Sequence, residues 1–296
     1  MRTFAVAKAQ GTGNDFILLD NAVGERLPFA ALARIWCERR FGIGADGLLV
    51  LEPPTVEDAD VSMRIFNADG SEAEMCGNGI RCVVRFLEQT RAGPRSALTV
   101  QTASGLVRAR PTTRGGSSVV AVEMGVPRFA KADIPMRGDP DARAIDEQVE
   151  VPGTASIRIC AISVGNPHCV TFIDTPVECS DLAAHAASLA ALDLFPNGAN
   201  FEIARVAGAT LRMRVFERGV GETQACGSGA CAVGVAAILT GRATSPVDVH
   251  MPGGSVNIEW AGPGAPVVMS GPAEIVFFAK IGVPDELLAA HTPASA

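Results

Sequence analysis

Lysine and histidine are scarce in this chain, and motifs that identify several common classes of enzyme are absent. The lysines among the 296 residues are Lys8, Lys131 and Lys280. The histidines are His168, His185, His250 and His291. A pyridoxal phosphate enzyme needs an active-site lysine, and none of the three lies in an evident active-site motif. The sequence also has no CxxC pair and no HExxH motif. We therefore expect no cofactor and no metal site.

Membrane-spanning and secretory segments, basic clusters and a dense cysteine pattern are missing as well. No apolar run reaches the ~18–20 residues of a membrane span, and the opening MRTFAVAKAQGTGNDF lacks the features of a signal peptide. The formal net charge of −7 argues against a nucleic-acid partner. Eight cysteines are too few for a disulfide scaffold in a chain of this length. We expect reduced thiols, a cytoplasmic location and no membrane partner.

What the sequence does contain is a long internal repeat. The stretch MRIFNADGSEAEMCGNG at 63–79 aligns without gaps on MRVFERGVGETQACGSG at 213–229. Both end in Cys-Gly-X-Gly, with Cys76 in the first copy and Cys226 in the second. Other segments repeat in the same order at an offset of about 150 residues. They are 13–20 with 165–172, 29–40 with 180–192, 45–52 with 199–206, and 100–107 with 249–256.

The repeat predicts two pseudo-symmetric copies of one α/β fold, each with short alternating strands and two helices. The helix after Cys76 has a narrow polar stripe that includes Arg81, and we expect it to end at Gly93 and Pro94. The helix after Cys226 is apolar on every side, so we expect a curled, barrel-like sheet around it.

We place the two halves of the chain at 1–127 and 128–273. The final residues, 274–296, should return to complete the first half, because they begin with another strand pattern.

A cysteine directly before Gly-X-Gly and a helix lies at the positive end of the helix dipole, beside free backbone N–H groups. We expect this setting to lower the pKa of the thiol and the glycines to let a carboxylate approach the N–H groups. Two such elements facing one another would place a base on each side of one carbon. A thiolate removes the proton beside the carboxylate, and a thiol returns one to the opposite face. A lone cysteine at a glycine turn is more often structural, but the aligned pair favours this chemistry.

Six motifs together resemble those of the diaminopimelate epimerase family. They are GTGNDF, RRFGIGADGLL, FNADGSEAEMCGNGIRC, SVGNPHCV, ERGVGETQACGSGACA and PGGSV, and they extend from residue 11 to residue 256. The resemblance implies two pseudo-symmetric domains with the site in the cleft. It also implies that the chain interconverts LL- and meso-diaminopimelate, without pyridoxal phosphate, on the route to lysine and peptidoglycan. The chain departs from the family at Ala9-Gln10, commonly Met-His, and at Gly47, where some members have Gln.

The resemblance assigns roles to individual residues. It makes Cys76 and Cys226 the acid/base thiols, and it places His168 and Glu217 in support of catalysis. The residues it implies for substrate binding are Asn14, Asn67, Gly77, Asn78, Asn166, Asn200, Glu217, Arg218, Gly227 and Ser228. Chemistry agrees with this, because an arginine can grip a carboxylate at two points while a glutamate suits an ammonium. Without the family, the asparagines could be turn residues and His168 an ordinary buried histidine.

Two other functions stay open at the level of the sequence. A proline or hydroxyproline racemase of the same architecture would share the two cysteines, but such relatives typically have His where this chain has Asn78, and they lack the Glu-Arg-Gly of 217–219. A thiol redox or metal-binding protein would use Cys76 and Cys226 in another way, although metal binding needs three or four ligands. The sequence does not fix which thiol is the base. A homodimer is kept as an expectation, since the oligomeric state is not fixed either.

Overall fold

The chain separates into two compact units in the computed structural model, which describes residues 1–91, 96–152 and 156–289. The first unit combines Met1–Val122 with Pro272–Ala296, and the second is Glu123–Gly271. The boundaries expected from the sequence lie a few residues later in the chain at both places.

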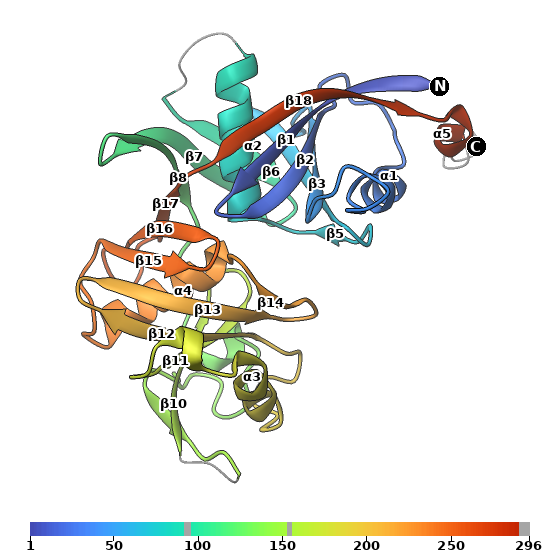
Figure 1. The fold of residues 1–296 in the computed structure, drawn as a ribbon. Helices are drawn as coiled ribbons and strands as arrows, with labels where there is room; N and C mark the ends of the chain where they lie inside the picture. The colour runs from blue at the N-terminus through green and yellow to red at the C-terminus, as the bar shows by residue number, and fades with distance from the viewer. Residues whose placement is uncertain (92–95, 153–155, 290–296) are drawn as a thin grey trace. The chain divides into compact units, whose positions relative to one another are not determined.

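The first unit is built on one curled sheet, coloured blue to green with one red strand in Figure 1. In order of pairing, its strands are β18 (Glu274–Val283), β1 (Arg2–Gly11), β2 (Asn14–Asp20), β3 (Gly47–Glu52), β4 (Val61–Asn67), β6 (Leu98–Thr102), β7 (Gly105–Arg114) and β8 (Ser117–Glu123). The short β5 (Glu72–Ala73) pairs with β4. The β2–β3 and β4–β6 pairs are parallel and the rest antiparallel. The last strand of the chain thus returns to pair with the first.

The second unit repeats this pairing strand for strand. Its strands are β9 (Glu147–Val149), β10 (Ile157–Ser163), β11 (Pro167–Phe172), β12 (Asn200–Ala207), β13 (Thr210–Glu217), β15 (Val247–Met251), β16 (Gly254–Glu259) and β17 (Val268–Gly271), with β14 (Gly221–Thr223) beside β13. Here too the third and fifth junctions in the order of pairing, β11–β12 and β13–β15, are parallel. The prediction of a mixed α/β fold written twice is confirmed.

Pairing also corrects one detail of the repeat. Phe16 pairs with Gly47 in the first unit, while His168, at the matching position of the second, pairs with Asn200. Gly47 therefore corresponds to Asn200, one residue away from the alignment of 45–52 with 199–206. The shift matters because a one-residue slip in a strand exchanges its two faces.

Each sheet curls around one helix that begins directly after a motif cysteine. These helices are α2 (Gly77–Thr90) and α4 (Gly227–Leu239). Residues from Ala230 to Ala237 of α4 are completely buried, and α4 contacts β10 to β13, β15 and β16. This is the wrapped helix that its apolar sequence predicts. The helix end expected at Gly93 and Pro94 lies outside the described residues.

The polar stripe predicted for α2 is wrong at Arg81, which is fully buried. Its guanidinium donates from Nε to the Pro272 carbonyl at 3.1 Å and from one terminal nitrogen to Thr12 Oγ1 at 3.0 Å. A buried arginine needs such acceptors because its charge and five donors cannot be left without partners. Arg81 therefore ties α2 to the turn before β2 and to the chain entering β18.

The remaining helices lie outside the sheets and are shorter than the patterns 29–40 and 180–192 suggest. They are α1 (Phe29–Trp36), α3 (Leu182–Ala190) and α5 (Asp285–Ala289), with 3-10 turns at Lys131–Asp133 and Val177–Cys179. Helix α1 packs Leu32 and Trp36 against the core that contains Phe4 and Ile17. None of the helices in the described parts of the chain is long and apolar enough to span a membrane.

Candidate active site

Cys76 caps the N-terminus of α2. Its backbone is extended, and its Sγ accepts a hydrogen bond from the backbone N–H of Gly79 at 3.4 Å. This is the position that Ser, Thr, Asp or Asn usually occupies in a capped helix. The side chain is partly exposed, and its Sγ lies 3.8 Å from Asn14 Oδ1. A thiol in this position contacts both a fixed N–H donor and an amide acceptor.

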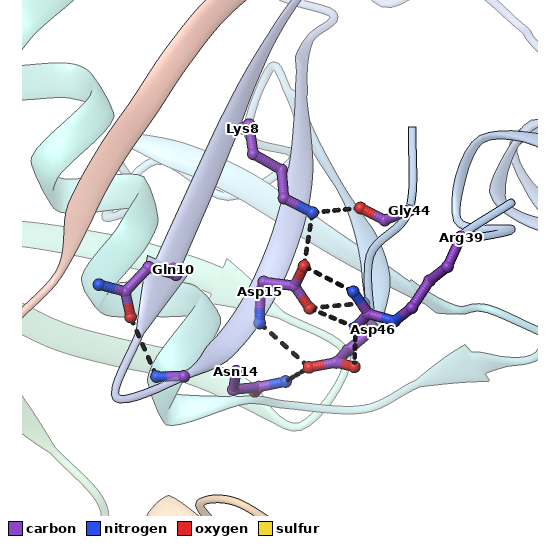
Figure 2. A network of polar contacts seen from close by, with 8 residues as sticks. Lys8, Gln10, Asn14, Asp15, Arg39, Gly44 and Asp46 are labelled. Carbon is purple, nitrogen blue, oxygen red and sulfur yellow. Dashed lines mark hydrogen bonds and ion pairs between the residues drawn. The ribbon is translucent and has the colours of Figure 1, made fainter. Parts of the chain in front are cut away.

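Asn14 belongs to a closed network of charged residues between β1, β2 and the segment before β3 (Figure 2). Its Nδ2 donates to Asp46 Oδ2 at 2.8 Å. Arg39 donates to both Asp46 and Asp15, at 2.8 and 2.7 Å, and Lys8 donates to Asp15 at 2.5 Å. Burial acts to raise the pKa of Asp15, but the hydrogen bonds from Arg39 and Lys8 outweigh burial and lower this pKa to about 2. Two cations and two anions pair within this network.

Asn78 lies in the first turn of α2 and is almost completely buried. Its Nδ2 donates to Asn14 Oδ1 at 3.1 Å, while its own Oδ1 has no hydrogen-bond partner among the described residues. Asn67 is engaged differently, because its amide donates to Ser71 Oγ at 2.9 Å within the turn after β4. The structure thus joins Cys76, Asn14 and Asn78 by direct contacts, and Asn67 stabilises its own turn.

Cys226 caps α4 in the same way, and its Sγ accepts from the Gly229 N–H at 3.4 Å and lies 3.5 Å from Ser228 Oγ. Unlike Cys76, it is buried. Burial raises the pKa of the Cys226 thiol well above its usual value, and the negative charges of Glu217 and Glu202 act in the same direction. The prediction that the helix terminus would lower this pKa is therefore wrong, because desolvation and two carboxylates outweigh the N–H donors.

Glu217 lies at the end of β13 near Cys226, and its charge acts on the pKa of the Cys226 thiol. The hydroxyl of Thr223 donates to its Oε1. Burial raises the pKa of Glu217, and the hydrogen bond from Thr223 partly offsets that effect. A carboxyl group close to the thiol can hold or accept the proton that the thiol exchanges.

His168 and Glu202 form a fully buried pair behind the N-terminus of α4. His168 Nδ1 lies 2.6 Å from Glu202 Oε1, and His168 Nε2 lies 2.9 Å from Asn166 Oδ1. The second oxygen of Glu202 has no hydrogen-bond partner among the described residues. The sequence analysis did not select Glu202, although a carboxylate in the middle of an apolar strand, between Phe201 and Ile203, was an available signal.

The final glycine of each Cys-Gly-X-Gly is needed for packing. A Cβ added to Gly79 would lie 3.0 Å from a methyl group of Leu49, and one added to Gly229 would lie 2.9 Å from Glu202 Oε1. Leu49 and Glu202 occupy matching positions of β3 and β12. These glycines therefore let each helix terminus approach its own sheet, in addition to any role toward a ligand.

Asn200 and Arg218 lie at one end of the second unit beside a cavity of about 190 Å³. Asn200 Oδ1 accepts from the backbone N–H of Arg218 at 2.9 Å, and the Arg218 guanidinium donates to the Asn197 carbonyl at 2.9 Å. Phe195 and Phe201 form apolar walls of the cavity, and Glu217 and Arg218 supply its charges. One side of this cavity is therefore suited to aliphatic carbon and another to charged groups.

No group of three or more potential metal ligands is found within 1–91, 96–152 and 156–289. The contacts described above involve thiols, amides, carboxylates and an imidazole arranged for hydrogen bonding. Two residues of the site were not predicted from the sequence. Asp46 contacts Asn14 and Glu202 contacts His168, and both of these partners were predicted.

Comparison with known proteins agrees with the motifs. The model of the family described as diaminopimelate epimerase matches residues 6–130 and 160–276. A diaminopimelate epimerase of Desulforudis audaxviator is 45% identical over 276 residues, which cover 92% of this chain and 97% of that one. One of Pseudomonas aeruginosa is 41% identical over 275 residues, covering 93% and 97%.

Solved structures with the same fold are more distant in sequence. A PhzF-family phenazine biosynthesis protein of Bacillus anthracis has a TM-score of 0.68 at 16% identity, covering 96% of this chain and 100% of that one. A hydroxyproline epimerase from Agrobacterium vitis, with bound trans-4-hydroxy-L-proline, has a TM-score of 0.65 at 16% identity, covering 95% and 91%. These likenesses show the fold alone. The family model and the relatives above 40% identity decide between the branches of this fold, and the chain belongs to the diaminopimelate epimerase family.

Proposed function

We propose that this protein is an isomerase that interconverts LL-2,6-diaminopimelate and meso-diaminopimelate by proton transfer at one Cα, with Cys76 and Cys226 as the two acid/base groups and no cofactor. The observation that carries the proposal is the matched pair of cysteine helix caps, each with its Sγ 3.4 Å from the N–H of the third residue of its helix. Membership of the family supports the choice of substrate. The reaction belongs to lysine and peptidoglycan precursor synthesis.

In the proposed reaction, one cysteine acts as thiolate and takes the Cα proton, and the other acts as thiol and delivers its proton to the opposite face. The electron pair left on Cα moves onto the α-carboxylate, and it returns to form the new C–H bond. The reverse reaction exchanges the two roles. We assign the α-carboxylate to the free N–H groups at Gly77–Asn78 and Gly227–Ser228, where the helix dipoles favour negative charge.

Cys226 rests as a thiol in the absence of substrate. Burial and the nearby carboxylates raise its pKa, so its proton is retained at neutral pH. An ammonium group arriving beside Glu217 would offset the carboxylate charge and make the thiol easier to ionise. We therefore assign Glu217 a part in the proton transfer as well as in substrate binding, because its charge raises the pKa of the nearby Cys226 thiol.

The far end of diaminopimelate carries a second ammonium and a second carboxylate, which need partners of their own. Arg218 is exposed beside the cavity in the second unit and is the proposed partner of the carboxylate. Asn67, Asn166 and Asn200 are proposed to complete the binding of substrate. Holding the distal end fixes the reacting carbon between the thiols, and positioning of this kind supplies a large part of the rate.

The test is NMR of LL-diaminopimelate in deuterium oxide, with reductant and no added cofactor. Wild type should place deuterium at Cα and form the meso isomer, and Cys76→Ala and Cys226→Ala should each lose epimerisation. Cys82→Ala and Cys231→Ala are the matched controls, because these buried cysteines lie further along the same two helices. Exchange with proline in place of diaminopimelate would move the protein to the rival racemases. Loss of activity in the control variants alone would refute the assigned thiols.

A cytoplasmic location and a homodimer complete the proposal. Support for the location is that all eight cysteines are free thiols, as the mechanism needs for two of them. Support for the dimer comes from β18, on which Val276, Phe277 and Phe278 are exposed. Light scattering of the purified protein measures the oligomeric state directly, and a mass of one chain at micromolar concentration would reject the dimer.

A further inference from the structure

Asn14 lies between a carboxylate and the thiol of Cys76. Its Nδ2 donates to Asp46 Oδ2 at 2.8 Å, and its Oδ1 lies 3.8 Å from Cys76 Sγ and 3.1 Å from Asn78 Nδ2. An amide has a donor end and an acceptor end, and turning it exchanges the two. The end that faces Cys76 therefore depends on what holds the other end.

Asp46 leaves Asn14 only one orientation. A carboxylate paired with arginine carries no proton and can only accept hydrogen bonds, so Asn14 must present its NH2 group to Asp46 and its carbonyl oxygen to Cys76. The orientation of Asn14 also fixes that of Asn78, which must turn its own NH2 group toward the Asn14 oxygen. The result is visible in the buried Asn78 Oδ1, which has no partner among the described residues. If the two amides could turn freely, a buried oxygen without a hydrogen-bond partner would not be expected.

The position of Asp46 is itself fixed from three sides. Arg39 donates to its Oδ1 at 2.8 Å, and the backbone N–H of Asp15 donates to its Oδ2 at 3.1 Å. In return, the backbone N–H of Asp46 donates to Asp15 Oδ1 at 3.2 Å. Figure 2 shows Arg39 reaching both carboxylates from the side opposite the Asn14 amide. The network therefore holds Oδ2 of Asp46 in a fixed position.

Among its described residues, the second unit has no counterpart of this arrangement. Asn166 matches Asn14, but its Oδ1 faces the imidazole of His168. The register that matches Gly47 with Asn200 places Ala199 at the position of Asp46. A carboxylate that orients the amide is thus specific to the half that contains Cys76.

We propose that Asp46 is a positioning residue that fixes the acceptor end of Asn14 toward Cys76 and so favours the protonated thiol of that cysteine. The inference rests on the proposed function for its catalytic meaning, because Cys76 must gain and lose a proton in each turnover. The Gly79 N–H favours the thiolate, and the Asn14 oxygen favours the thiol. Each protonation state of Cys76 thus has a contact that stabilises it.

Charged groups around Asn14 come from several elements of the first unit. The titratable groups around Asn14 and the start of α2 are Lys8 on β1, Asp15 on β2, Arg39 and Asp46 before β3, Glu74 before α2, Arg81 and Cys82 on α2, and Glu274 on β18, which accepts from the Gln10 amide. Because Lys8 and Arg39 pair with Asp15 and Asp46, the network itself carries no net charge. The orientation of the amide is the influence of Asp46 on the thiol that the experiment below separates from its charge.

The experiment measures iodoacetamide alkylation of Cys76 against pH, followed by peptide mass spectrometry in the full-length protein. Asp46→Ala removes the acceptor of the Asn14 NH2 group, so the amide can turn and its oxygen no longer has to face Cys76. The pH midpoint of Cys76 alkylation should then fall, and Cys76 in this variant should be alkylated about three- to tenfold faster than in wild type at a pH below the midpoint. Asp46→Asn removes the same charge but keeps an acceptor for Asn14, and it should stay close to wild type. Asp285→Asn, an exposed carboxylate of the same unit that pairs with the chain's amino group, is the neutral control.

A double-mutant cycle with Asn14→Ala separates orientation from charge. Asn14→Ala alone should shift the midpoint as Asp46→Ala does, and the double variant should shift it no further. Equal shifts in Asp46→Ala and Asp46→Asn, or additive shifts in the cycle, would overturn the inference in favour of a direct charge effect. Circular dichroism checks folding, and Asp46→Ser replaces the alanine variant if that one unfolds. Alkylation needs no substrate. If the wild-type protein lacked epimerase activity, the proposed function would be rejected, but the alkylation rates would still test the role of Asp46.

Discussion

The pairing of Asp15 with Lys8 and Arg39 predicts that neutralising this single side chain weakens the first unit in a pH-dependent way. Its pKa falls from 3.8 to about 2 in the folded chain, and its side chain is only 17% exposed. At about 1.4 kcal/mol per pH unit, the shift corresponds to roughly 2 kcal/mol of stability at pH 7. Because the folded pKa is depressed, this contribution is present above the unfolded value and is lost as the pH falls through about 2.

Asp15→Asn should therefore lower the free energy of unfolding by about 2 kcal/mol at pH 7 and by about half as much at pH 3. The assay follows from the two tryptophans, Trp36 in the first unit and Trp260 in the second. In a Trp260→Phe background, urea unfolding followed by fluorescence reports on the first unit alone. With a typical slope of 1–3 kcal/mol per molar urea, the midpoint at pH 7 should fall by about 1 M.

Asp285→Asn serves as the control in the same background. Its partner is the exposed amino group of Met1, and the loss of a surface ion pair should change stability by less than about 1 kcal/mol. The reasoning is refuted if Asp15→Asn lowers stability by the same amount at pH 3 as at pH 7. That outcome would mean that the side chain acts through packing and that its charge contributes nothing.

Further predictions concern the two helix termini and their support. Arg81→Met leaves the buried Thr12 hydroxyl and the Pro272 carbonyl without their donor, so the first unit should lose about 2–4 kcal/mol in urea unfolding while the second unit is unchanged. Gly234→Val should destabilise the second unit by about 2–3 kcal/mol, because even a Cβ at this position would lie 2.8 Å from an Ile258 methyl group; equal unfolding of both units would contradict it. Glu217→Gln removes a charge that raises the pKa of Cys226, so the pH midpoint of Cys226 alkylation should fall, and an upward shift would show the opposite coupling.

The duplicated fold could be predicted from the sequence, because the hydrophobic pattern and the glycine turns that mark its strands and helices depend on neighbouring residues. Aligned motifs at 63–79 and 213–229 placed Cys76 and Cys226 at equivalent helix starts, and the apolar sequence of α4 indicated a wrapped helix. The ionisation of Cys226 could not be predicted in the same way. It depends on desolvation and on Glu202, which reaches the thiol only through the folding of β12 beside α4.

The errors at Arg81 and in the register of β12 share one cause. A helical wheel assigns arginine to a solvated face, and it cannot show that a backbone carbonyl from the far end of the chain would reach Arg81. Likewise, the residues around Asn200 resemble those around Asp46 closely enough to be aligned one position apart. Only the strand ladder, in which His168 pairs with Asn200, fixes which face each side chain occupies.

The corrected register explains how two equal frames come to hold unequal chemistry. Each helix terminus rests on the same strand position, but that position is Leu49 in the first unit and Glu202 in the second. The residue two places after the turn asparagine differs likewise, since Phe16 in the first unit corresponds to His168 in the second. The second unit has thus exchanged two apolar core residues for a buried ionisable pair, 2.6 Å apart, behind its cysteine.

Such an exchange is costly for stability, because buried ionisable groups lose their hydration and gain only what their partner supplies. Folding alone does not account for it, since the first unit builds the same sheet and helix with apolar side chains at both positions. The first unit instead has the network around Asp15 and Asp46, which reaches its cysteine through one amide. In the proposed reaction one thiol gives a proton while the other takes it, and the two thiols differ in their environments. Divergence at these few positions supplies that difference within a repeated fold.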